Sequence, residues 1–110
     1  MDPAGLVAWY TEDGTFRSAN APPARGKAAI TAALKQFHVL ITSMSHRMTG
    51  CWVDGTSGVW EAEVTFGTRT GETITIPAVS ILRTDGRLVH DFRMMMDAGP
   101  ILAPATDARR

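Results

Sequence analysis

This chain of 110 residues has little cysteine, no surplus of either charge and no long apolar run. Its one cysteine, Cys51, excludes an intrachain disulfide and a zinc site built from several cysteines. The 11 basic and 11 acidic residues give a formal net charge of +0. The only adjacent arginines are Arg109 and Arg110, so neither nucleic acid nor a membrane surface is predicted as a partner. No apolar run approaches the ~20 residues that a membrane helix needs.

The same scarcity of features predicts a soluble cytoplasmic protein. A single cysteine fits a reducing compartment, and the N-terminus lacks the basic and apolar regions of a secretory signal. The length predicts one domain, which can bury roughly two thirds of the surface of its unfolded chain. We place this domain at residues 1–97 and an irregular tail at residues 98–110, where Pro100 and Pro104 interrupt regular structure.

The most informative pattern is a series of apolar-alternating runs in the second half of the chain. We expect four strands, at residues 46–53, 59–66, 72–82 and 88–96. The pairs Asp54-Gly55 and Asp85-Gly86 favour tight turns, because they tolerate the positive φ angles that such turns need. The runs therefore predict an antiparallel meander. They are too apolar for a sheet with one wet face, so we expect a sheet that curls around a side-chain core or a ligand cavity.

Two helices are predicted ahead of the meander. Asp2-Pro3 is typical of a helix start, and the helix that follows carries one apolar face and ends at residues 12–14. A short strand at 15–18 and a loop at 19–24 come next, because two consecutive prolines prevent regular structure. The second helix runs from Gly26 to Ile41, with its apolar residues on one stripe. This order predicts an α+β domain with helices on one face of a strongly bent sheet.

Four segments carry a resemblance to a known family: residues 6–16 (LVAWYTEDGTF), residues 25–30 (RGKAAI), residues 59–66 (VWEAEVTF), and Asp85-Gly86 leading to Met96-Asp97. Together they resemble the SnoaL-like branch of the nuclear-transport-factor-two-like (NTF2-like) superfamily, which includes polyketide cyclases, ketosteroid isomerase and limonene epoxide hydrolase. The resemblance implies a cone-shaped curved antiparallel sheet, an α+β barrel, which packs on helices around an apolar cavity. It also implies a homodimer through the outer face of the sheet.

The resemblance departs from the family pattern at the N-terminus. Family members usually carry a long helix before the segment that starts here at Asp2, and that helix forms part of the cavity wall. Without it the pocket is open, capped by a partner chain or capped in another way. A start codon chosen too far downstream would give the same sequence.

The catalytic residues of two characterised relatives are not matched. In the ketosteroid isomerase pattern the base position falls on Ser18 and the acid position on Val79, and the tyrosine belongs to the missing helix. In the epoxide hydrolase pattern the Arg and Asp positions fall on Glu61 and Glu63, or on Trp60 and Ala62 if the hairpin gap is placed differently. The last acid of that pattern falls on Met94. Neither mechanism is therefore expected.

SnoaL-like cyclases use an acid or histidine pair in the cavity, for which the local candidates are His46, His90, Asp91, Glu61 and Glu63. Glu61 and Glu63 alternate with apolar residues, as in any half-buried strand, so they can be ordinary outward-facing side chains. If they point into the cavity instead, they become usable general bases. His46 borders the pocket or is a structural histidine. The catalytic residues stay unassigned, with His46, Glu61 and Glu63 as weak candidates.

We expect a ligand pocket lined by residues of the strands and the second helix, with Ser18 and Val79 placed there by the family resemblance: Phe16, Ser18, Phe37, His46, Met48, Trp52, Trp60, Val79, Phe92, Met94 and Met96. No metal site is predicted, because His38, His46 and His90 are dispersed in the sequence. No cofactor is predicted either, since no glycine loop that could hold a phosphate is present.

Three functional hypotheses follow. The first is a protein that binds an apolar small molecule and acts as an isomerase, cyclase or hydratase on a hydrophobic polycyclic or lipid-like substrate by general acid-base catalysis. The second is a non-catalytic binding or dimerisation module whose cavity is filled by its own side chains. The third is a truncated member that needs a partner to complete the cone and exposes Leu6, Trp9 and Phe37.

Overall fold

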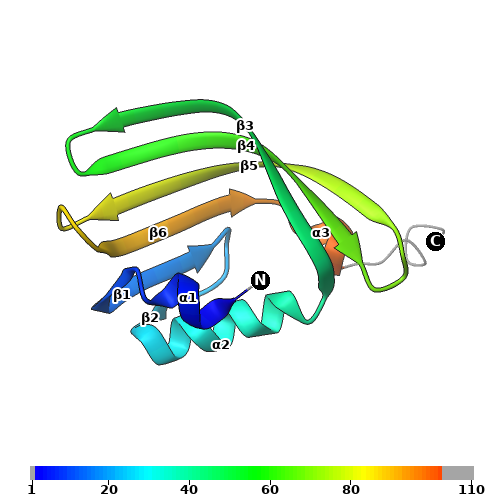
Figure 1. Cartoon of the computed structure of the whole chain (residues 1–110), viewed down its shortest axis with the longest axis horizontal. Helices are drawn as coiled ribbons and strands as arrows, with labels where there is room; N and C mark the ends of the chain where they lie inside the picture. The colour runs from blue at the N-terminus through cyan, green and yellow to red at the C-terminus, as the bar shows by residue number, and fades with distance from the viewer. Residues whose placement is uncertain (1, 103–110) are drawn as a thin grey trace.

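The computed structural model describes residues 2–102, which form one curved sheet and its covering helices (Figure 1). In chain order the elements are α1 (Pro3–Val7), β1 (Tyr10–Ser18), β2 (Ala24–Arg25), α2 (Lys27–His38), β3 (Ile41–Asp54), β4 (Ser57–Thr68), β5 (Thr73–Thr84), β6 (Val89–Met96) and α3 (Gly99–Leu102). The strands are ordered β2-β1-β6-β5-β4-β3, and only the pair β1 and β6 within this sheet is parallel. No helix within residues 2–102 is long and apolar enough to span a membrane.

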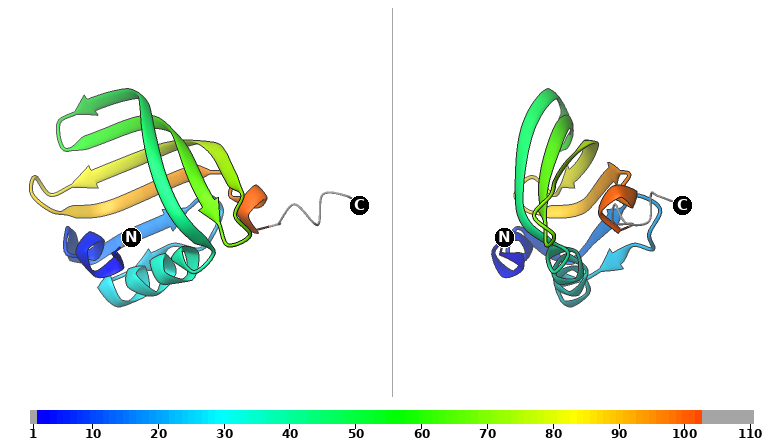
Figure 2. Two further views of the ribbon diagram at one scale, coloured as in Figure 1. Left: turned by 45° about the vertical axis from the view of Figure 1, so that its right-hand side comes forward. Right: turned by 90° about the vertical axis from the view of Figure 1, so that its right-hand side faces the viewer.

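The sheet bends over α2 and leaves a concave face toward the helices (Figures 1 and 2). β2 and β3 stand at its two edges, so the sheet does not close on itself. The predicted α+β fold with a cone-shaped curved sheet is therefore confirmed. Gly55 and Gly86 have φ angles of 59° and 97°, which is the conformation that the two Asp-Gly turns were expected to require.

Alternation along the strands puts the core on the concave face. Ala62, Val64 and Phe66 of β4 are buried, and each is paired with an apolar residue of β5. From the helix side, Ile30 is fully buried and Phe37 meets Phe66 edge to face, with ring centroids 5.6 Å apart. The apolar stripe of α2 therefore covers the inner face of the sheet, as predicted.

The first helix is shorter than its apolar pattern predicts. α1 ends at Val7, and Tyr10 already belongs to β1, where it lies in register with Val89 of β6. The Val89 amide donates to the Trp9 carbonyl over 2.8 Å, which begins the parallel pairing of β1 with β6. Tertiary pairing thus overrides the helical spacing, and residues 12–14 lie inside β1 instead of ending a helix.

Two further boundaries differ from the sequence prediction. α2 ends at His38, and Ile41 opens β3, which the sequence predicts to begin only at residue 46. Residues 99–102, placed by the sequence in an irregular tail, form α3, whose Ile101 is buried in the core. The rest of that tail, residues 103–110, lies outside the described residues.

A candidate ligand cavity between α2 and the sheet

Two adjoining hollows lie between α2 and the concave face of the sheet. The first, here called the α1 lobe, has a volume of about 300 Å³. Its lining comes from both helices and most strands: Leu6, Trp9, Tyr10, Phe16, Leu34, Phe37, His38, Met44, His46, Val64, Phe66, Leu82, Val89, Phe92 and Met94. Leu6 and Trp9 of this lining are 47% and 65% exposed, whereas Phe37 is half-buried.

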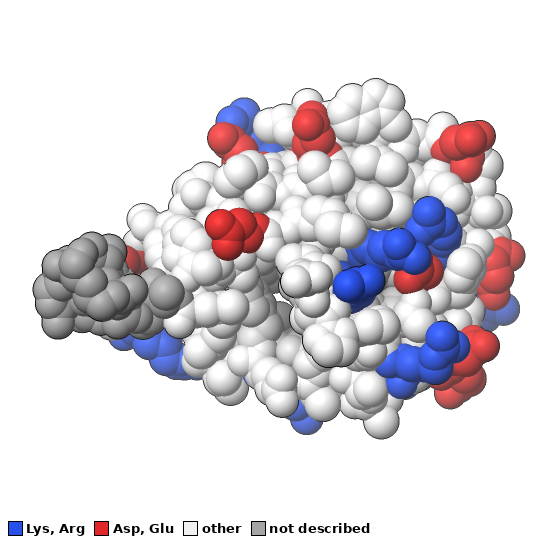
Figure 3. Space-filling model, turned by 180° about the vertical axis from the view of Figure 1, so that it is seen from behind, with Lys and Arg blue, Asp and Glu red and all other residues white. Residues whose placement is uncertain are grey.

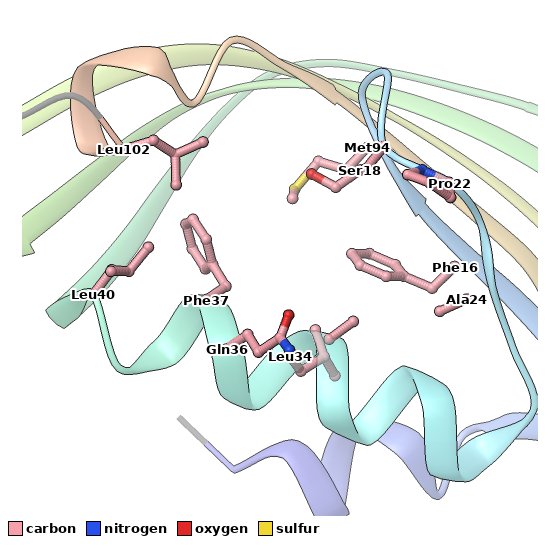
Figure 4. A pocket seen from close by; sticks show the side chains of 12 residues that line it. Phe16, Ser18, Pro22, Ala24, Leu34, Gln36, Phe37, Leu40, Met94 and Leu102 are labelled. Carbon is pink, nitrogen blue, oxygen red and sulfur yellow. The ribbon is translucent and has the colours of Figure 1, made fainter.

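The second hollow, here called the α3 lobe, has a volume of about 440 Å³ and extends toward the C-terminal helical turn. Figure 4 shows Phe37 and Leu34 rising from α2 while Phe16 and Met94 approach from the sheet. Ser18 and Gln36 are the polar side chains of this lobe, and its remaining lining is apolar: Ala21, Pro22, Ala24, Ala33, Leu40 and Leu102.

Four residues belong to the lining of both lobes: Phe16, Leu34, Phe37 and Met94. Strand register explains how Phe16 and Met94 meet there. Phe16 of β1 pairs with Phe92 of β6, two residues before Met94. The aromatic rings of Phe16 and Phe92 lie 5.9 Å apart. The two lobes therefore adjoin, with these four side chains at the boundary between them.

The polar side chains of the α1 lobe are Tyr10, His38 and His46. Burial, assisted by the negative charge of Asp91, raises the pKa of Tyr10 to about 12, so its hydroxyl keeps its proton at neutral pH. Burial also lowers the pKa of His38, whose Nδ1 is buried without a hydrogen-bond partner among residues 2–102. His46, by contrast, is exposed at the rim. The lobe therefore offers a phenolic donor and two imidazoles beside apolar walls.

The lowered pKa of His38 makes stability depend on pH. The unfolded chain takes up the His38 proton more readily than the folded chain, so acid favours unfolding. We expect the free energy of unfolding to fall as the pH drops from about 7 to about 5. Replacing His38 with Gln should flatten this part of the profile, measured by urea unfolding at each pH. Equal slopes for the two proteins would contradict this assignment.

The structure brings six of the predicted pocket residues to the cavity. Phe16, Phe37 and Met94 line both lobes, His46 and Phe92 line the α1 lobe, and Ser18 lines the α3 lobe. Leu34, Tyr10 and His38 were not among the predicted lining residues. Leu34 could have been found, because it lies on the same helical stripe as Phe37.

Three predicted residues share the concave side but lie outside this lining. Met48 is 59% exposed near the free edge of the sheet, and Met96 is buried in the core beneath α3. Trp60 packs edge-on against Phe92, with ring centroids 5.8 Å apart. It therefore supports a residue of the cavity wall without lining the cavity itself.

Trp52 and Val79 lie on the outer face of the sheet, which corrects their predicted place in the pocket. The pairing of β3 with β4 shifts between Met48 and Gly50, and this bulge reverses which residues point inward. A Cβ added to Gly50 would lie 2.6 Å from the Trp52 ring and 3.0 Å from Glu61 Oε1. The Trp52 ring therefore lies over Gly50, on the same outer face as Glu61. Val79 faces outward because it is paired with Glu61.

Glu61 and Glu63 lie on that outer face, in register with Val79 and Pro77 and alternating with the buried Ala62 and Val64 of the same strand. Glu63 forms an ion pair with Arg47. Because His46 lines the cavity from the opposite face, the structure does not bring a glutamate and His46 together. Within the described residues, no carboxylate lines either lobe.

The bent sheet and the hollow beneath it define an NTF2-like α+β domain. The chain belongs to the SnoaL-like domain family, whose model matches residues 1–91. This match confirms the resemblance seen in the sequence. No curated protein matches the chain significantly.

Solved structures share the fold at low sequence identity. A protein with a ketosteroid isomerase-like fold from Catenulispora acidiphila, solved in complex with trimethylamine, is 18% identical, with a TM-score of 0.82 over 96% of this chain and 83% of that one. An NTF2-like protein of unknown function from Burkholderia pseudomallei is 15% identical, with a TM-score of 0.81 over 92% and 82%. TerC, co-crystallised with polyporic acid, is 15% identical, with a TM-score of 0.77 over 88% and 80%.

Proposed function

We propose that this chain binds an apolar small molecule in the space formed by the two lobes. The observation that carries the proposal is the pair of hollows with largely apolar walls that share Phe16, Leu34, Phe37 and Met94. A space of this size falls in the range of small-molecule sites and is larger than the voids of an ordinary core. It also argues against the alternative of a module whose cavity is filled by its own side chains.

The shape and lining favour a hydrophobic polycyclic or lipid-like ligand. Aromatic and thioether side chains at the junction, from Phe16, Phe37 and Met94, suit flat or irregular apolar molecules. The fold relative TerC was crystallised with polyporic acid. The titratable side chains of the lining, Tyr10, His38 and His46, all belong to the α1 lobe, so we propose that the polar end of the ligand lies there.

We further propose His46 as the general acid-base group of an isomerase, cyclase or hydratase acting on such a ligand. Imidazole is the side chain most often used for general acid-base catalysis, and Tyr10 can donate a hydrogen bond to an oxygen on which negative charge develops. The glutamates are not part of this proposal, because they face away from the cavity. The competing function is a binding protein without catalysis, which the absence of a carboxylate from both described lobes favours.

One comparison tests binding and catalysis separately. Wild-type protein is titrated with the neutral dye Nile red, whose emission rises in apolar surroundings, and is assayed for isomerisation of a β,γ-unsaturated ketosteroid by ultraviolet absorbance. We expect saturable binding in wild type and in His46→Gln, with isomerisation lost in His46→Gln and kept in His90→Gln, whose histidine is exposed outside the cavity lining.

Each readout of this comparison has its own contrary outcome. Absence of saturable dye binding would overturn the ligand-binding proposal. Dye binding without any wild-type turnover of this substrate would favour the binding protein, and turnover that survives in His46→Gln would remove His46 from the catalytic assignment.

We also propose a homodimer through the outer face of the sheet, as the family resemblance implies. Trp52 and Met95 are 58% and 42% exposed on that face, where solvent-exposed apolar side chains are typical of an interface. A hollow of about 310 Å³ lies on the same face, lined by Met95 together with Arg47, Glu61 and Pro77. Sedimentation equilibrium reports such an association directly.

A further inference from the structure

A cluster of charged side chains lies on the outer face of the sheet, on the side away from the cavity. It is built from β1, β5 and β6, where Thr15 and Asp91 are in register across one strand pair and Arg83 and Asp91 across the next. Figure 3 shows basic side chains gathered around an acidic one on this side of the molecule. We call this group, Thr15, Arg83, Asp91 and Arg93, the Asp91 cluster.

Asp91 holds the two guanidinium groups side by side. Its Oδ2 accepts from Arg83 Nη1 over 3.1 Å and from Arg93 Nε over 3.0 Å, and its Oδ1 accepts from the Thr15 hydroxyl over 2.6 Å. Burial raises the pKa of Asp91, but these hydrogen bonds and the positive charges outweigh burial and hold that pKa below its ordinary value. The carboxylate is therefore charged at neutral pH and fixes both arginines in place.

The cluster has more positive charge and more donors than Asp91 can satisfy. A guanidinium carries five N–H donors, and Asp91 uses one from each arginine. Among residues 2–102, neither of these two guanidinium groups has another hydrogen-bond partner. Their free donors border a hollow of about 370 Å³, which Arg25, His90 and Asp13 also line.

The charge of this hollow differs from that of the chain as a whole. The chain is neutral, with 11 basic and 11 acidic residues, whereas the lining brings together three arginines and only two aspartates. One of those aspartates, Asp91, is already engaged by two arginines. Arg17 is in register with Arg93 on the neighbouring strand but lies outside this lining, and its Nε donates to the Ala21 carbonyl over 3.0 Å. Like charges placed directly opposite one another destabilise a sheet unless a counter-charge compensates them.

We propose that the hollow beside the Asp91 cluster is a binding site for a small oxyanion, a carboxylate or phosphate group, held between the free donors of Arg83 and Arg93. The planar guanidinium fork matches both kinds of anion in geometry and charge. Asp91 acts as a positioning residue, because it holds the arginines together without touching the anion. This site is separate from the cavity, from which it is divided by the thickness of the sheet, and it does not depend on the function proposed there.

The test is a titration of the ¹⁵N-labelled full chain with inorganic phosphate and, in a second arm, with succinate, followed by NMR shifts of backbone and arginine Nε–H signals. Potassium chloride at matched ionic strength controls for screening. We expect saturable shifts at Thr15, Arg83 and Arg93 with at least one of the two anions. Arg83→Gln and Arg93→Gln should each weaken that affinity about tenfold, as loss of a charge-assisted contact does.

Arg69→Gln is the matched control, because Arg69 is an exposed arginine in the turn between β4 and β5, outside this lining. Its affinity for the anion should equal that of wild type. Binding of phosphate alone assigns a phosphate-bearing ligand, and binding of succinate alone assigns a carboxylate. The proposal is overturned if neither anion gives saturable shifts, or if the shifts persist unchanged in both Arg83→Gln and Arg93→Gln.

Discussion

Replacing Phe66 with Ala is expected to lower the free energy of unfolding by about 3–5 kcal/mol, the largest stability effect among the cavity residues. Phe66 is 1% exposed and meets Phe37 of α2 edge to face at 5.6 Å. Its loss removes buried apolar surface and the main aromatic contact between helix and sheet. Domains of this size have total stabilities of about 5–15 kcal/mol, so much of the folding free energy is at stake.

Urea unfolding followed by circular dichroism measures this change directly. Phe66→Leu is the matched control, because it keeps an apolar side chain and should lose less than half as much stability as Phe66→Ala. A loss below about 1 kcal/mol in Phe66→Ala would show that the neighbouring cavity lets the site collapse around the vacancy, and that Phe66 does not hold α2 on the sheet.

The fold could be predicted because its signals are local and repeated. Alternation along β4 places Ala62, Val64 and Phe66 on one face and the two glutamates on the other, without any knowledge of the partner strands. The Asp-Gly pairs mark two reversals, and the helical stripe of α2 faces the sheet as its spacing requires. The predicted element boundaries are wrong where pairing between distant segments determines the structure. Tyr10, for example, belongs to β1 because that strand pairs with β6.

The candidate site was predicted only in part, because assigning alternate residues of a strand to the same face fails at a β-bulge. The extra residue between Met48 and Gly50 leaves His46 on the cavity side and turns Trp52 to the opposite side. Gly50 is the one sequence signal of that shift, because an isolated glycine inside a strand often marks a bulge or a close approach of another group. Similarly, alternation separates the two faces of β4 but does not identify the inner one. The burial of Ala62 and Val64 beneath the helices identifies it.

The Asp91 cluster was missed for a different reason. A sequence scan detects basic runs, and the arginines here come from separate strands that meet only through register. The sequence named Asp91 as a candidate for an acid pair in the cavity, and its partners Thr15 and Arg83 lie on β1 and β5. A neutral chain can therefore carry a locally basic hollow that composition does not reveal.

Replacing Met94 with Trp is expected to weaken dye binding at least tenfold, which corresponds to about 1.4 kcal/mol. Met94 lines both lobes where they adjoin, and Figure 4 shows its side chain directed into the space opposite Phe37. An indole at this position fills the junction and separates the lobes. Because the larger ring grows into empty space, we expect it to cost less stability than the ~1–3 kcal/mol typical of overpacking in a filled core.

The adjacent residue supplies the control for this experiment. Met95 follows Met94 on β6 but points to the outer face, where it is paired with Val79 and 42% exposed. Met95→Trp makes the same chemical change one residue away and should leave the affinity for Nile red within about twofold of wild type, since surface substitutions have small effects. If both variants bind the dye as wild type does, the dye occupies another surface, and the junction of the two lobes is not where apolar ligands bind. A selective loss in Met94→Trp ties binding to the interior face of β6, because strand alternation alone distinguishes the two positions.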